Sequence, residues 1–191
     1  MRRCLAIAAL LLAAFSASAK EIPDVDVVDQ TGRPLHFYRD LVAQKVVVVA
    51  FFFTRCQDAC PVVAHTLLHL QTALGDRLGR DVSIVSVSID PKHDTPAVLA
   101  EWGKTHGVKP GWTLVTGDPA AMNGVTRAIS GDNARTGLHS ITLYLGNDRT
   151  GEWISDAGSL STEHYLELLA RLSRTPWGRG TGHSSSPSRS E

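Results

Sequence analysis

Two cysteines, Cys56 and Cys60, are separated by three residues and follow the longest buried strand that the sequence predicts, where a helix is predicted to begin. A helix N-terminus offers unpaired N–H groups and positive potential, which favour thiolate over thiol. A spacing of i, i+4 can present both sulfurs on one side. Two thiolates form a soft site, suited to Cu(I), Zn(II) or Fe–S chemistry. The pair indicates metal binding or thiol redox chemistry, with an inert pair or a structural disulfide as the alternative.

A metal ion bound by two cysteines needs at least one further ligand, and His139 is the best candidate. It comes just before a predicted strand at 141–145. In a thioredoxin-like sheet the turn before that strand faces the cysteine loop, and dithiol reductases of that fold carry a cis-proline there. This sequence has no proline between Pro119 and Pro176. The histidine therefore favours metal ligation over general disulfide exchange, the alternative being a solvated loop histidine.

The elements that must position these residues follow from the pattern of apolar side chains. The segment 45–53 contains an unbroken apolar run of valines, one alanine and phenylalanines, which is typical of a strand buried on both faces. In 61–78 the apolar side chains recur at i, i+3 and i+4, which predicts an amphipathic helix. The other expected elements are strands at 25–28, 35–37, 82–89 and 112–115, a hairpin of 141–145 and 152–155, and helices at 94–106, 118–129 and 161–174.

This order of elements predicts the α/β class, as a thioredoxin-like three-layer sandwich with an N-terminal β-hairpin extension. The length of 191 residues suits one domain. Hydrophobic residues make up 43% and charged residues 20% of the chain, as in ordinary globular proteins. Lysine plus arginine equals aspartate plus glutamate at 19 each, so nothing in the charge balance suggests a nucleic-acid partner.

Both ends of the sequence differ from the middle. Residues 1–19 combine two arginines, an apolar run too short to span a bilayer, and Ala17-Ser18-Ala19, which predicts a cleavable signal peptide and a periplasmic location. Retention through an uncleaved N-terminal segment is the alternative. Cleavage would remove Cys4 and leave Cys56 and Cys60 as the cysteines of a domain at 20–174. The polar residues 175–191 are predicted to be a disordered tail.

Other polar residues near the cysteines give weaker indications. His65 and His69 are four residues apart on the predicted helix, a spacing that can clamp a metal ion. They fall away from its apolar stripe, however, so a solvated helix face is favoured. Asp58 could cap a backbone N–H beside the cysteines, or it could simply be exposed.

Four blocks of this sequence resemble the Sco/SenC family of copper proteins, which act in cytochrome oxidase assembly. Residues 53–61 are similar to the family signature Thr-x-Cys-x-Asp-x-Cys-Pro. Residues 88–96 and 112–118 are similar to its second and third blocks, and His139-Ser140 before a strand resembles its fourth. The resemblance covers roughly residues 22–172.

The resemblance implies a thioredoxin-like fold and copper, Cu(I) or Cu(II), bound by Cys56, Cys60 and His139. It also implies delivery of copper to the copper-site subunit of a terminal oxidase or another exported cuproprotein, or reduction of that site's cysteines. A copper donor protein would be a second partner. No nucleic-acid partner and no stable membrane span after signal cleavage are expected.

Two enzymatic functions compete with the metallochaperone. A periplasmic thiol–disulfide oxidoreductase would use Cys56 and Cys60 as its redox pair, and His139 in place of the cis-proline argues against it. A peroxidase of the peroxiredoxin type would place threonine and proline at fixed positions before its cysteine. Here Thr54 is one residue too close, and no proline occurs between Pro34 and Pro61.

Overall fold

The computed structural model describes residues 20–57, 59–131 and 141–173. Within these ranges a seven-stranded sheet has the strand order β2-β1-β5-β4-β3-β6-β7. The strands are β1 (Asp26–Asp29), β2 (Pro34–His36), β3 (Val46–Phe52), β4 (Val82–Ser88), β5 (Trp112–Gly117), β6 (Thr142–Asn147) and β7 (Glu152–Ala157). The main helices are α1 (Ala59–Leu74), α2 (Pro96–Thr105), α3 (Pro119–Ser130) and α4 (Thr162–Ser173).

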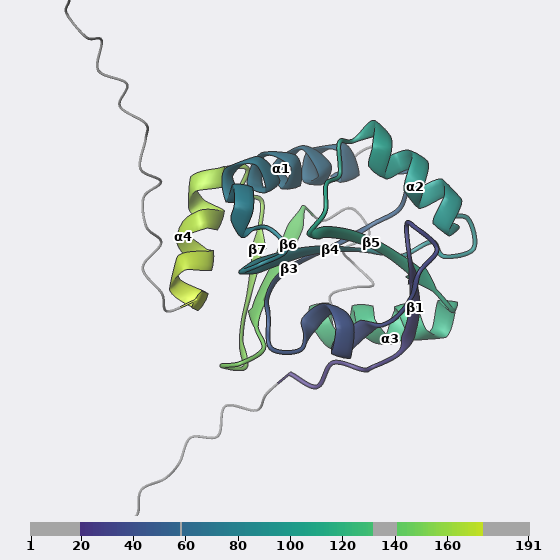
Figure 1. Cartoon of the computed structure of the whole chain (residues 1–191), viewed down its shortest axis with the longest axis horizontal. Coiled ribbons are helices and arrows are strands. Elements are labelled where there is room, and N and C mark those ends of the chain that lie inside the picture. The colour runs from purple at the N-terminus through teal and green to yellow at the C-terminus, as the bar shows by residue number, and fades with distance from the viewer. Residues whose placement is uncertain (1–19, 58, 132–140, 174–191) are drawn as a thin grey trace, which may run out of the picture.

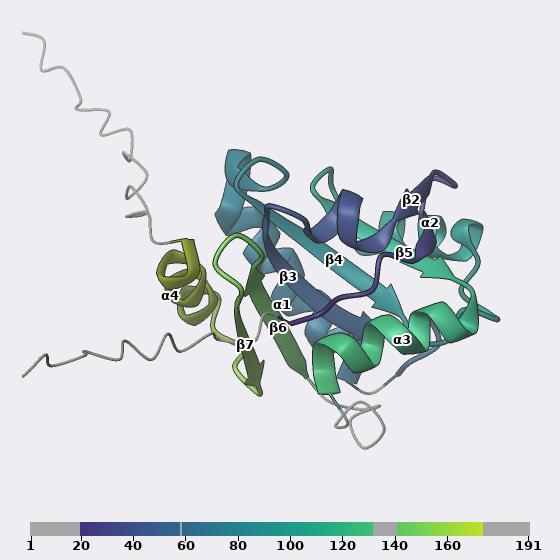
Figure 2. The same cartoon turned by 90° about the horizontal axis from the view of Figure 1, so that it is seen from below.

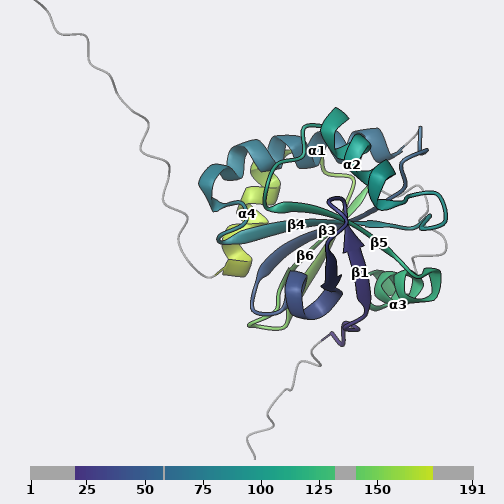
Figure 3. The same ribbon diagram turned by 45° about the vertical axis from the view of Figure 1, so that its right-hand side comes forward.

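Three layers are visible in Figure 1, with the sheet between two layers of helices. Helices α1, α2 and α4 cover one face, and α3 with the short helical turn η1 (Phe37–Val42) covers the other. Figure 2 shows the same arrangement from below, and Figure 3 shows it after a 45° turn about the vertical axis. The structure is therefore the α/β sandwich with an N-terminal β1–β2 hairpin that the sequence predicts.

Strand β3 lies at the centre of this arrangement. It pairs in parallel with β4 and antiparallel with β6. Its alternate residues belong to the two opposite hydrophobic cores: Val48 and Ala50 face α1 and α4, whereas Val47 and Val49 face α3. A strand that serves both cores must be apolar throughout, which explains the uninterrupted run in the sequence.

Because β3 and β4 are parallel and adjacent, the segments that follow them leave the sheet at the same edge. The segment after β3 carries Cys56 and leads into α1, and the segment after β4 leads into α2. Strand β6 runs antiparallel to β3, with Leu143 paired to Ala50, so the chain enters β6 at this same edge. Three connections thus converge where the sequence predicts a site.

The helix after the cysteines differs from its prediction at both ends. It begins at Ala59, two residues before the predicted start at Pro61, so Cys60 lies inside its first turn. It ends at Leu74 because Gly75 adopts a positive φ of 51°, a conformation favourable for glycine. A short 3₁₀ turn, η2 (Gly75–Arg77), then covers residues that the sequence assigns to the helix.

Smaller differences concern the two hairpins. Phe37 is expected in a strand but opens the turn η1, where its side chain is fully buried. Strand β6 ends at Asn147 and β7 begins at Glu152. Gly146 and Asn147 therefore lie in a strand where the sequence predicts a turn. The buried Asn147 side chain donates to the Leu172 carbonyl at 2.8 Å, a tertiary contact that the local pattern does not reveal.

Several predictions fall outside the described residues. They concern the signal peptide at 1–19, Asp58, His139, and the tail at 175–191 with its His183. Among the helices of the described ranges, none combines the length and the apolar character needed to cross a membrane.

Candidate metal centre

Cys60 lies in the first turn of α1, and Cys56 precedes that helix by three residues. The N–H of Cys60 donates to the Cys56 sulfur at 3.3 Å, and the N–H of Cys56 donates to the Phe53 carbonyl at 3.1 Å. Neither cysteine takes part in a disulfide. The helix start therefore directs a backbone N–H at one sulfur, the arrangement that makes such positions favourable for sulfur chemistry.

The two sulfurs have different surroundings. Cys60 is 8% exposed and belongs to the core cluster beneath α1, whereas Cys56 is only partly buried at the edge of that cluster. Burial raises the pKa of Cys60 to about 12, and the hydrogen bond with Cys56 and the charge of Asp94 act in the same direction. Cys60 is thus a protonated thiol at neutral pH, contrary to the lowered pKa expected for a helix start.

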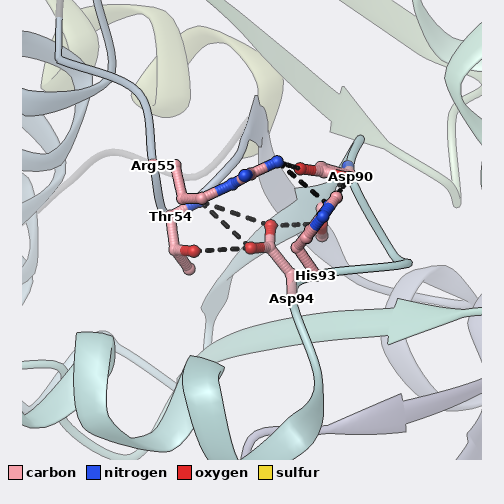
Figure 4. A network of polar contacts seen from close by, with 6 residues as sticks. Thr54, Arg55, Asp90, His93 and Asp94 are labelled. Atoms are coloured by element: carbon pink, nitrogen blue, oxygen red, sulfur yellow. Dashed lines mark hydrogen bonds and ion pairs between the residues drawn. The ribbon is translucent and has the colours of Figure 1, made fainter.

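A buried carboxylate holds the cysteine turn from behind. Asp94 is 0% exposed and accepts hydrogen bonds from the hydroxyl of Thr54 at 2.5 Å and from the hydroxyl of Ser88 at 2.6 Å. The N–H of Thr54 lies 3.3 Å from both carboxylate oxygens. Figure 4 shows Asp94 between these segments. Asp94 precedes α2 by two residues. Its side chain therefore links Thr54, before the cysteines, to Ser88 at the end of β4.

A second, exposed contact joins the same two segments. The Arg55 guanidinium lies 2.8 Å from one Asp90 oxygen, and His93 Nδ1 lies 2.8 Å from the other (Figure 4). The hydrogen bond from His93, followed by that from Arg55, lowers the pKa of Asp90. Arg55, the residue before Cys56, is thereby joined to the segment that follows β4.

The sequence did not assign these supporting residues a role. Residues 88–96 were assigned to the end of a strand, the start of a helix and a family block, and no contact with the cysteine segment was predicted for them. The available signal was Ser88 at the end of a strand predicted to be buried, followed six residues later by the carboxylate of Asp94. A buried carboxylate needs hydrogen-bond donors, and Thr54 could have been sought as one because its own strand ends at the same sheet edge.

His139 lies outside the described residues, so its contacts with the cysteines are not established. The first residue described after that gap is Ile141, which packs against the core cluster that includes Cys60. Ile141 also lines a pocket together with Val63 and Thr66 of α1. The chain therefore reaches β6 next to the cysteine-bearing helix, two residues after His139.

The remaining described histidines do not contribute to the cysteine turn. His65 and His69 lie on the exposed face of α1, as expected, but their Nε2 atoms are only 3.1 Å apart. Each of three others has a partner that the sequence had not shown: His36 pairs with Asp26, His164 with Asp156, and His106 with the carbonyl of Trp102. Among the described residues, no three metal-binding side chains form a common cluster.

The comparison with known protein families decides the identity of this fold. Residues 16–141 match the sequence profile of SCO1/SenC. The chain belongs to the SCO1/SenC family. This confirms the resemblance carried by the four sequence blocks. A SCO2-like protein of Rickettsia felis is 34% identical over 146 residues, which cover 74% of this chain and 67% of the relative.

Solved structures of SCO1/SenC proteins share the fold of this chain. Yeast Sco1 with copper bound has a TM-score of 0.61 at 19% identity, covering 83% of this chain and 98% of the yeast chain. BsSco, described as a Sco-family cytochrome c oxidase assembly protein with a disulfide switch, has a TM-score of 0.66 at 21% identity, covering 83% and 96%. At these identities the likeness establishes the thioredoxin-like fold.

The pKa of Cys60 predicts an order of thiol reactivity. At pH 7, iodoacetamide should modify Cys56 before Cys60, because the thiolate is the nucleophile and Cys60 keeps its proton. With a pKa raised to about 12, the rate at Cys60 should rise about tenfold per pH unit from pH 7 to 10. Fragment-ion mass spectrometry distinguishes the two positions, and the unfolded chain in denaturant provides the control. Equal rates at pH 7, or a plateau at Cys60 below pH 9, would contradict this assignment.

The Asp94 contacts predict a large effect of removing that carboxylate. Asp94→Ala should lower the free energy of unfolding by about 2–4 kcal/mol, because it leaves buried donors of Thr54 and Ser88 without an acceptor. Asp94→Asn should cost less, since the amide keeps one acceptor oxygen and a hydroxyl can rotate to accept from its NH₂. Asp90→Ala is the matched control, with a loss below about 1 kcal/mol for an exposed pair. Equal losses for Asp94→Ala and Asp90→Ala in urea unfolding would refute the anchoring role.

Proposed function

We propose that this chain is an exported copper metallochaperone that delivers copper to the copper site of a respiratory oxidase. Cys56, Cys60 and His139 are the proposed ligands. The observation that carries the proposal is the contact between the two cysteines at the start of α1, outside any disulfide, with Thr54 just before them held by the buried Asp94. Copper is the cargo of this site.

The chemistry of the donor set supports copper over hard cations. Two thiolates and one imidazole suit trigonal Cu(I), whereas Cu(II) would take a further ligand such as water. Among solved structures of the family, yeast Sco1 has copper bound. A fixed cysteine turn keeps both sulfurs on one side of α1, and the partial exposure of Cys56 provides a route for an acceptor thiolate to reach the copper ion.

Transfer by this route would pass through thiolates shared between donor and acceptor. A first acceptor thiolate binds the copper ion, a second acceptor thiolate displaces Cys56, and the ion then leaves Cys60, which takes up a proton. The high pKa of Cys60 favours this last step, because the free sulfur is protonated at neutral pH once the metal has left. The copper ion keeps its oxidation state throughout.

Thiol–disulfide chemistry is the second candidate function, and the reduced state of the pair favours it. Cys56 is the more exposed sulfur and would attack a recipient disulfide. That attack forms a mixed disulfide with Cys56 and releases one recipient thiol. Cys60 would then attack the Cys56 sulfur and displace the second recipient thiol, forming a Cys56–Cys60 disulfide as the recipient gains two electrons and two protons. The disulfide switch of BsSco is compatible with such a cycle. Both activities could serve one recipient, since a copper site must have reduced cysteines.

The proposed setting is the periplasm, after cleavage of residues 1–19 from a domain at 20–174. The partners are the copper-site subunit of a terminal oxidase, or another exported cuproprotein, and a copper donor protein. BsSco, which shares this fold, is described as belonging to a family of cytochrome c oxidase assembly proteins, which supports the choice of recipient. Retention in the membrane through an uncleaved N-terminal segment is the alternative.

A transfer assay separates the metallochaperone from the general reductase. The full chain loaded with one Cu(I) should lose copper faster as the concentration of an acceptor dithiol peptide rises, because acceptor thiolates enter before copper leaves. The same preparation, free of copper, should reduce insulin only slowly. The variant Cys56→Ser is the control, and it should lose both copper transfer and insulin reduction. A copper off-rate independent of the acceptor, together with rapid insulin reduction, would favour the oxidoreductase instead.

A further inference from the structure

A second group of metal-binding side chains lies further along α1, on the face turned away from the core. His65 and His69 are both exposed, and the opposite side of the helix carries the buried Leu67 and Leu70. The helix has no Asp, Glu, Lys or Arg. The two imidazoles are thus the accessible ionisable groups of this helix surface, apart from the partly buried cysteine end.

The rings already have the separation that a shared metal ion requires. Their Nε2 atoms are 3.1 Å apart, and the ring centroids are 4.3 Å apart with an interplanar angle of 64°. Two nitrogens at this separation, each about 2.05 Å from one ion, subtend an angle of about 100° at the ion. That angle lies between the values for square-planar and tetrahedral coordination. Without a metal ion, the same contact is a hydrogen bond, which requires a neutral acceptor ring, and neutral imidazole is the form that binds metals.

The pair is separate from the cysteine centre. His65 and His69 follow Cys60 by five and nine residues on one continuous helix. At a rise of about 1.5 Å per residue they lie roughly 7–14 Å further along its axis. One ion cannot be bound by the histidines and the cysteines together, so each group would hold its own.

We propose that His65 and His69 form a second metal site, a two-imidazole chelate for divalent copper. Imidazole nitrogen suits Cu(II), Ni(II) and Zn(II), and Cu(II) binds most strongly to a given nitrogen site in this series. No described acidic or sulfur side chain joins the pair in a cluster of three. Water or another small ligand completes the coordination, so the site binds reversibly. It holds no thiolate and therefore does not share the preference of the cysteine pair for Cu(I).

The experiment titrates Cu(II) into the full chain carrying Cys4→Ser, Cys56→Ser and Cys60→Ser, because free thiols would reduce Cu(II). Calorimetry measures affinity, and electron paramagnetic resonance identifies nitrogen ligands. We expect a site with two imidazole nitrogens, weakened at least about tenfold by His65→Ala or by His69→Ala, since even the loss of an outer-shell partner costs about 10–100-fold. Circular dichroism of each variant checks that the helix is unchanged.

A spacing variant provides the matched control. His69→Ala combined with Thr72→His keeps the number of histidines but places them seven residues apart, at exposed positions. At about 1.5 Å per residue the two rings are then two turns apart, too far to share one ion. This variant should bind Cu(II) as weakly as His69→Ala alone, whereas His36→Ala should bind like the parent.

Two results would overturn the proposal. One is Cu(II) affinity within twofold of the parent in both single histidine variants, and the other is parental affinity in the spacing variant. Either result would leave the cysteine centre untouched, because that centre is tested with Cu(I) in chains that retain Cys56 and Cys60.

Discussion

The buried carboxylate of Asp94 is the interaction on which the cysteine turn depends. It accepts hydrogen bonds from Thr54, just before the turn, and from Ser88, at the end of the neighbouring strand. A carboxylate buried to 0% exposure is stable only where donors surround it, so the two segments must stay together. The parallel pairing of β3 and β4 brings those segments to one sheet edge, and Asp94 fixes their relative position there.

The same arrangement makes the two sulfurs chemically unequal. Cys60 lies in the core and keeps its proton, whereas Cys56 is only partly buried and accepts a backbone hydrogen bond. One sulfur is thus accessible to an incoming partner, and the other is shielded behind it. This asymmetry suits ordered ligand exchange, in which a partner thiolate enters at the exposed sulfur and the buried sulfur is the last to release the metal ion.

The sequence predicted the elements of this fold well because the decisive patterns are local. The apolar run of β3, the proline after Thr95 and the capping residue Asp118 each mark an element that the structure contains. The helix end at Gly75 and the Asp94 contacts were missed, since the first depends on one backbone conformation and the second on residues 40 positions apart. Cys56 and Cys60 were predicted as the site from their spacing and place, but the high pKa of Cys60 follows from tertiary burial that the spacing cannot reveal. The role of His139 stays a prediction.

X-ray absorption spectroscopy of the full chain loaded with one Cu(I) tests the central claim most directly, because it counts the atoms bound to copper. The account predicts a three-coordinate ion with two sulfur ligands and one nitrogen ligand. In His139→Ala the nitrogen should disappear while both sulfurs remain, and in Cys60→Ser one sulfur should be lost. A nitrogen ligand that persists in His139→Ala, or a copper ion with no pair of sulfur ligands in the unaltered chain, would contradict the proposed centre.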